Sequence, residues 1–248
     1  MSIFRYEDKN SLSACVFTAL LAITSTVGFA DSAPYLYGTK YRAVLDDSKL
    51  QAPTSATLIR RGDFNDPDAH NSYFYIPDSG NRYMTFTVSG ASKRSELRQM
   101  EEWYTSDPSW NKLIGTLLAV DPLSSQVDQL TFMQIHDSES LNKPLVRLTW
   151  RRSRSGKNDH NWAVIRDSAG SSSDYTYVDM GPRSDAPTKF EIKVRNNLLT
   201  IKVDGITFVD KRDVSYWQHL SSYFKAGVYL QDSGTGTVQF KSLKYYYQ

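Results

Sequence analysis

Apolar and polar residues alternate along most of this chain, and residues 223–231 (Tyr-Phe-Lys-Ala-Gly-Val-Tyr-Leu-Gln) show the alternation most clearly. The even positions, from Phe224 to Leu230, are all apolar, whereas the odd positions carry polar side chains around Gly227. Because successive side chains of a strand point to opposite faces, the stretch predicts a strand with one face in a core. Its polar face is either a tyrosine-rich outer surface, which is common in β proteins, or the floor of a groove. The glycine favours the groove, since glycine within a strand indicates a close approach to the backbone.

Comparable alternation recurs through the rest of the chain and predicts a molecule built almost entirely of short strands. We expect strands at residues 84–88, 94–98, 113–120, 130–136, 145–150, 162–166, 175–180, 190–194, 199–203, 206–208, 223–231 and 238–247. Asn196-Asn197 and Asp204-Gly205 predict hairpin turns, and only residues 214–221 suggest a short helix. This pattern is typical of an all-β, two-sheet antiparallel sandwich or jelly roll, and 248 residues fit a single domain.

The first thirty residues have a different composition. Residues 12–29 are a largely apolar run, and Gly28-Phe29-Ala30 places small residues where a signal peptidase cuts. We therefore interpret residues 1–30 as a secretory signal peptide, with a short membrane anchor as the alternative. Cleavage would remove Cys15, the only cysteine, and leave an exported chain without a disulfide or a membrane span. We divide the remainder into a polar lead-in at residues 31–51 and one β domain at residues 52–248.

Composition limits the ligands only loosely. Aromatic residues make up 13% of the chain, which suits sugar stacking, and the net charge of +2 permits a polyanion without demanding one. The basic run at residues 151–157 predicts a hairpin loop, either merely solvated or a lip that attracts a polyanion. Nucleic acid is a weaker interpretation, because the chain has no nucleic-acid motif. The four histidines, His70, His136, His160 and His219, show no metal-ligand spacing, so we expect no metal and no cofactor.

Two further polar segments join the one at residues 223–231. Residues 94–98 read Arg-Ser-Glu-Leu-Arg, and residues 134–136 read Gln-Ile-His, with Ile135 facing away from the polar pair. In this order the three segments resemble the signatures R-(S/T)-E-L-R, Q-(I/V)-H and Y-x-K-A-G-x-Y-x-Q of polysaccharide lyase family 7, the alginate lyases. The resemblance covers residues 52–246 and implies a β-jelly roll with a substrate groove on its concave sheet.

The resemblance also implies residue roles. It implies that Arg94, Gln134, His136 and Tyr229 form the catalytic set, and that the chain binds substrate through Glu96, Arg98, Tyr223, Lys225 and Gln231. The chemistry of the side chains agrees with β-elimination at a uronate. A guanidinium and an amide can mask the substrate carboxylate, a histidine titrates near neutral pH, and a tyrosine can donate or accept a proton. Each residue alone would more simply be structural, as part of a surface salt-bridge ladder or as a buried histidine.

The resemblance further implies how the work is divided between substrates. For mannuronate Tyr229 would serve as base and acid, and for guluronate His136 would be the base. In relatives, isoleucine at the position of Ile135 accompanies action on guluronate-containing or mixed blocks, so we predict that substrate preference. We also expect a secreted, monomeric enzyme. A lyase for another polyuronate such as glucuronan, and a non-catalytic carbohydrate-binding sandwich, remain alternatives. A glycoside hydrolase is disfavoured, because no strand carries paired carboxylates at alternate positions.

Overall fold

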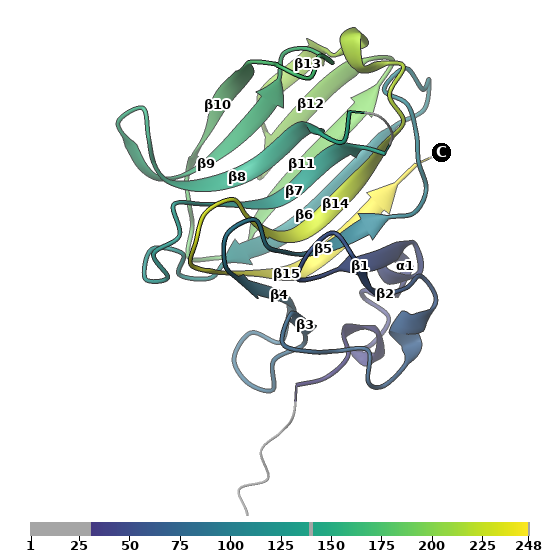
Figure 1. Ribbon diagram of the computed structural model, residues 1–248, viewed down its shortest axis with the longest axis vertical. Coiled ribbons are helices and arrows are strands. Elements are labelled where there is room, and N and C mark those ends of the chain that lie inside the picture. The colour runs from purple at the N-terminus through teal and green to yellow at the C-terminus, as the bar shows by residue number, and fades with distance from the viewer. Residues whose placement is uncertain (1–30, 139–140, 248) are drawn as a thin grey trace, which may run out of the picture.

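Two antiparallel sheets face one another in the computed structural model, which describes residues 31–138 and 141–247 (Figure 1). The eight-stranded sheet has the order β10 (Tyr175–Pro182), β9 (Lys157–Arg166), β8 (Pro144–Arg154), β7 (Gln129–Asp137), β14 (Ser222–Leu230), β5 (Arg94–Gln99), β1 (Ser48–Gln51) and β2 (Thr57–Ile59). The seven-stranded sheet has the order β13 (Ile206–Asp213), β12 (Leu198–Val203), β11 (Thr188–Arg195), β6 (Asn111–Ala119), β15 (Thr235–Tyr246), β4 (Met84–Ser89) and β3 (Phe74–Tyr75). The predicted two-sheet sandwich is confirmed. The signal peptide interpreted at residues 1–30 lies outside the described residues.

Helical structure is limited to short pieces in the described residues. These are α1 (Arg42–Asp46) and the 3-10 turns η1 (Pro34–Leu36), η2 (Asp63–Asn65) and η3 (Ser215–Trp217). The last falls within the short helix expected at residues 214–221. None of the described helices is long and apolar enough to cross a membrane.

The core lies between the sheets and is formed by the apolar positions of the alternating pattern. Phe224 and its apolar neighbours on β14 are fully buried. The ring of Phe132 on β7 packs 4.7 Å, centroid to centroid, from that of Phe190 on β11, and so joins the two layers. Burying one large apolar side chain contributes roughly 1.5–3 kcal/mol, so dozens of such residues hold the sheets together without a disulfide. The opposite face of the eight-stranded sheet is thereby free to carry polar groups.

Gly227 lies where β14 approaches β5 closely and where its pairing with β7 is irregular. A Cβ atom at this position would lie 2.2 Å from the carbonyl oxygen of Ser95 on β5, and φ is +148°, so only glycine fits. The close approach predicted from the sequence therefore comes from the neighbouring strand and not from a ligand. Against β7, the register of β14 shifts between Ala226 and Tyr229, which is a β-bulge. Such a bulge re-aims the next side chain, here Tyr229.

Residues 31–51 are not the polar lead-in that we expected. β1 pairs with β5, and Leu45 and Leu50 are fully buried. The Tyr41 hydroxyl donates to the Phe240 carbonyl at 2.7 Å and accepts from the Met84 backbone N–H at 3.1 Å. This segment is part of the sandwich, and Figure 1 shows its elements gathered at one end of the sheets.

The basic run at residues 151–157 is also not a loop. Its first four residues extend β8 and Lys157 begins β9, so only Ser155 and Gly156 turn, both with positive φ. The run is therefore mostly strand, and its arginine side chains can stack on neighbours in the sheet.

Candidate active site

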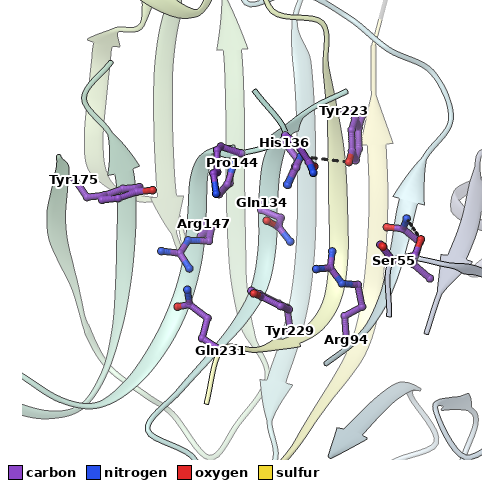
Figure 2. Close-up of a pocket in the computed structure, with 13 residues that line it drawn as sticks. Ser55, Arg94, Gln134, His136, Pro144, Arg147, Tyr175, Tyr223, Tyr229 and Gln231 are labelled. Atoms are coloured by element: carbon purple, nitrogen blue, oxygen red, sulfur yellow. Dashed lines mark hydrogen bonds between the residues drawn. The ribbon is translucent and has the colours of Figure 1, made fainter. Parts of the chain in front are cut away.

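A pocket of about 340 Å³ opens on the outer face of the eight-stranded sheet (Figure 2). It is lined by Gln51, Ser55, Arg94, Gln134, His136, Asn142, Lys143, Pro144, Arg147, Tyr175, Tyr223, Tyr229 and Gln231. Six of the nine residues singled out from the sequence lie here: Arg94, Gln134, His136, Tyr223, Tyr229 and Gln231. They come from β5, β7, β14 and the residue after β14, because these strands are neighbours in the sheet.

The charge of the pocket is one-sided. Arg94, Lys143 and Arg147 line it, and none of the described lining residues is Asp or Glu. Within the part of the chain that the structure describes, the Nε atoms of Arg94 and Arg147 are buried and have no hydrogen-bond acceptor. Buried guanidinium nitrogens without an acceptor are costly, so these two Nε atoms indicate a ligand that brings its own negative charge.

Arg94 and Tyr229 lie side by side at the centre of the pocket (Figure 2). They are directly opposed on β5 and β14, and the Arg94 guanidinium carbon is 4.8 Å from the centroid of the Tyr229 ring. A cation held over an aromatic ring is a favourable contact of about 0.5–1 kcal/mol or more. The pair therefore presents a phenol and a guanidinium together, close enough to reach one small ligand.

Glu96 and Lys225 do not line the pocket, contrary to the substrate-binding role expected for both. Each side chain is only 1% exposed, and the Lys225 Nζ lies 2.6 Å from Glu96 Oε2. Glu96 also accepts a hydrogen bond of 2.5 Å from the Gln134 amide and lies 3.5 Å from the Arg94 guanidinium. Burial lowers the pKa of Lys225 to about 8, although Glu96 acts in the opposite direction. The two charges form a layer beneath the floor that holds Gln134 and Arg94 in place.

His136 is held in one tautomer. Its Nδ1 lies 2.7 Å from the Asp137 carbonyl, which can only accept, so Nδ1 carries the proton and Nε2 has the free lone pair. Burial, with help from the nearby charge of Lys225, lowers the pKa of His136 to about 4. The expectation that this imidazole titrates near neutral pH is therefore wrong. It is neutral at pH 7 and presents an unprotonated nitrogen.

Arg98 is also outside the pocket, contrary to expectation. Its guanidinium carbon lies 3.9 Å from the centroid of the Tyr223 ring, and it pairs with Glu102. Tyr223 in turn stacks on His136, with the ring centroids 5.5 Å apart. Arg98 thus supports the wall of the pocket from behind, through Tyr223, and does not face the opening.

Arg147 and Tyr175 are the main residues that the sequence interpretation missed. Arg147 on β8 lies opposite Gln134, is 7% exposed, and has its guanidinium carbon 5.9 Å from the Tyr175 ring centroid. The available signal was a lone arginine within the apolar run at residues 145–148. Tyr175 comes from the edge strand β10, and no local pattern points to it. The remaining missed lining residues are Gln51, Ser55, Asn142, Lys143 and Pro144.

Cations and aromatic rings continue along the sheet beyond the pocket. Arg151 and Arg154 on β8 stack on Tyr177 of β10, with guanidinium carbons 5.2 Å and 3.1 Å from the ring centroid. Their Nε atoms also lack acceptors among the described residues. A ligand longer than the pocket could therefore extend over these strands.

The chain is similar to known alginate lyases. A family model described as alginate lyase matches residues 44–247. An alginate lyase of Photobacterium sp. is 30% identical over 208 residues, which cover 71% of this chain and 72% of that protein.

Solved structures agree with the sequence comparison. The alginate lyase AlyC3 is 28% identical with a TM-score of 0.80, covering 88% of this chain and 96% of that one. The complex of AlyC3 with dimannuronate gives 26% identity and a TM-score of 0.76, over 84% and 92% of the two chains. The family 7 alginate lyase A1-II′, at 20% identity and a TM-score of 0.66 over 85% and 99%, shares the fold.

Proposed function

The chain belongs to the alginate lyase family, and we propose that it cleaves alginate by β-elimination in the pocket built around Arg94 and Tyr229. The observation that carries this proposal is a pocket lined by three cations, a neutral imidazole and a phenol, with no carboxylate among its described lining residues. A hydrolytic glycosidase would need two carboxylates in the cleft. Elimination needs instead a masked uronate carboxylate, a base and an acid.

Charge masking is the first task. Abstraction of the C5 proton places negative charge on the uronate carboxyl group, and fixed donors stabilise that charge best when they are organised in advance. Arg94 has an unpaired buried Nε, and Gln134 gives one N–H to Glu96 and keeps the second. We assign both groups to the carboxylate of the sugar that is cleaved. Glu96 and Lys225 position these donors without touching the substrate.

Proton transfer is the second task. A base removes the C5 proton, the electron pair forms the C4=C5 double bond, the C4–O4 bond breaks, and an acid protonates the leaving O4. Tyr229 beside Arg94 is the acid. For guluronate, whose C5 hydrogen and O4 lie on opposite faces, the base is Nε2 of His136, which is unprotonated at neutral pH. For mannuronate, where both lie on one face, Tyr229 serves as base and acid.

Substrate preference is the finer part of the proposal. We assign guluronate-containing or mixed blocks, on the basis of the neutral His136 and of Ile135, which is buried in the core beneath it. The relative AlyC3 has been captured with dimannuronate, which supports a pocket able to hold mannuronate as well. The cations over β8 and β10 would bind further uronates of a long chain. We further assign a monomer exported through residues 1–30.

One assay tests the reaction. Purified residues 31–248 are incubated separately with polymannuronate, polyguluronate and glucuronan, and the ultraviolet absorbance of the unsaturated product is followed. Absorbance growth on the alginate polymers supports the proposal. Growth on glucuronan alone would assign another polyuronate, and binding without product would leave a carbohydrate-binding sandwich. Saturated reducing ends would mean hydrolysis, and the elimination mechanism would be wrong.

A further inference from the structure

A second hollow lies on the opposite side of the sandwich from the candidate active site. It measures about 420 Å³ and opens on the outer face of the seven-stranded sheet. Its lining includes Trp110, Lys193, Arg195, Leu198, Lys202 and Lys211. Lys193 alternates along β11 with the buried Ile192 and Val194, so its side chain points away from the core. We call this hollow the outer groove.

The backbone of the edge strand creates the outer groove. Between β12 and β13 the register shifts twice, from Leu199 to Ile201 and again from Ile201 to Lys202, and each shift places an extra residue in β13. Bulges bend a strand and increase its local twist. β13 therefore curves relative to β12, and Lys211 takes a positive φ of 45° at one of these irregular positions. Non-glycine residues rarely adopt that conformation, so the backbone shape of the groove includes an energetically unfavourable conformation at Lys211.

Trp110 forms one wall of the outer groove and gathers cations around itself. The Lys193 Nζ lies 4.4 Å from its ring centroid, and the Arg195 guanidinium carbon lies 5.3 Å away. The register places Lys112 beside Lys193 on the next strand, where its Nζ lies 5.3 Å from the Tyr246 ring. Large rings alternate here with cations across three neighbouring strands.

The charge of the outer groove selects its ligand class. Four of its lining residues are cationic and one, Asp210, is anionic. Glu191 lies opposite Lys202 on the same face and partly offsets that lysine. Leu198, 37% exposed, and the half-buried Trp110 add apolar surface. Cations around apolar ring faces suit a chain with regularly spaced carboxylates and apolar ring faces of its own.

We propose that the outer groove is a second, non-catalytic binding site for a segment of an anionic polysaccharide. The identity of the ligand as a polyuronate rests on the proposed function, whereas the existence of the site rests on the groove itself. Lys193 and Arg195 bind sugar carboxylates, and the Trp110 ring packs against a sugar face. Because it lies on the other side of the sandwich, this site keeps a polymer near the enzyme while another segment enters the active site. Such linkage raises the effective concentration of substrate.

Titration calorimetry with a short oligouronate tests the site directly. The protein is residues 31–248 carrying Tyr229→Phe, which slows cleavage during the measurement. We expect two classes of binding site, and a loss of about tenfold in the affinity of one class in Lys193→Ala/Arg195→Ala. Trp110→Ala should abolish that class, and Trp110→Phe should restore part of it. Lys189→Ala is the matched control, because Lys189 is an exposed cation on the same strand and outer face but outside the groove.

The results separate this proposal from the proposed function. In the otherwise unchanged enzyme, the Lys193→Ala/Arg195→Ala substitutions should leave turnover of short oligouronates unchanged and raise KM for long polymer severalfold. Two binding classes in the Tyr229→Phe protein, together with no unsaturated product from the enzyme that keeps Tyr229, would support the groove and refute the lyase. A single class, or equal losses with Lys189→Ala, would overturn the groove. It would also be overturned if a single-stranded oligonucleotide bound there more tightly, or if the groove variants only changed sedimentation, which would indicate a second copy of the chain.

Discussion

Replacing Glu96 with glutamine tests the central structural claim about the site, that a buried charge layer supports the donors facing the substrate. Glu96 is 1% exposed and joins three groups: the Lys225 ammonium at 2.6 Å, the Gln134 amide at 2.5 Å and the Arg94 guanidinium at 3.5 Å. Glu96→Gln keeps the shape of the side chain and removes its charge. Lys225, equally buried, then loses the anion that pairs with it among the described residues.

The expected loss of stability is large. Removing one partner of a buried ion pair costs about 3–5 kcal/mol, because the other charge stays desolvated. For a domain of this size that corresponds to a fall in Tm of roughly 6–20 °C. Removing both charges with Glu96→Gln/Lys225→Met should cost much less, about 1 kcal/mol, since a buried pair can often be replaced by apolar packing. The double variant should therefore fold, yet turn over slowly, because Gln134 and Arg94 lose their anchor.

Urea unfolding followed by circular dichroism measures the free energies, and initial rates on alginate measure turnover. Glu101→Gln is the control, because Glu101 pairs with Arg61 at 3.3 Å with both side chains about half exposed. Exposed pairs contribute about 0–1 kcal/mol, so this variant should resemble the wild type. The claim fails if Glu96→Gln is within 1 kcal/mol of the wild type, or if the double variant is as unstable as the single one.

Three further predictions concern the proton-transfer groups. Tyr229→Phe should remain folded and lower the rate about 10²–10⁴-fold on every alginate polymer, and near-normal turnover would refute its role as acid. His136→Ala should abolish cleavage of polyguluronate and affect polymannuronate less, so equal losses on both polymers would count against the division of labour. Because protonated His136 cannot act as base and its pKa lies at about 4, kcat/KM on polyguluronate should fall as pH drops through about 4, and an acidic limb near 6.5 would contradict the structure.

The fold could be predicted from the sequence where each strand alternates strictly. The apolar positions of β14 and β7 are the buried ones, and the hairpin at Asp204-Gly205 connects β12 to β13 as expected. The failures occurred where alternation is masked. Residues 31–51 bury scattered side chains such as Tyr41, Leu45 and Leu50 without a regular alternation. The basic run at residues 151–157 is polar on both faces although it is mostly strand. Period-two reasoning cannot detect a strand without an apolar face.

Only the part of the site that lies within local sequence motifs could be predicted. Residues two apart on one strand share a face, so Gln134 with His136, and Tyr223 with Tyr229, were expected together. The alternating pattern does not predict how deeply a polar side chain is buried. Glu96 and Lys225 share the polar face with the pocket residues, but the close packing of β5 against β14 encloses them. Arg147 lies on a different strand from the motif residues. Its position in the pocket depends on the order of the strands in the sheet, which cannot be predicted from any single segment.

The charges around His136 indicate that its low pKa should rise when substrate binds. Burial is its main cause, and the positive charges of Lys225 and Arg94 add to it. A uronate carboxylate bound to Arg94 would offset part of that positive charge and raise the pKa of the imidazole, because an opposite charge favours the protonated form. His136 therefore becomes a stronger base when substrate occupies the pocket and stays unprotonated when the pocket is empty. The acidic limb of kcat, which reports the enzyme–substrate complex, should accordingly lie at higher pH than that of kcat/KM, which reports the free enzyme. Coincident limbs in the two profiles on polyguluronate would show that the bound carboxylate does not act on His136, and the placement of that carboxylate at Arg94 would have to be abandoned.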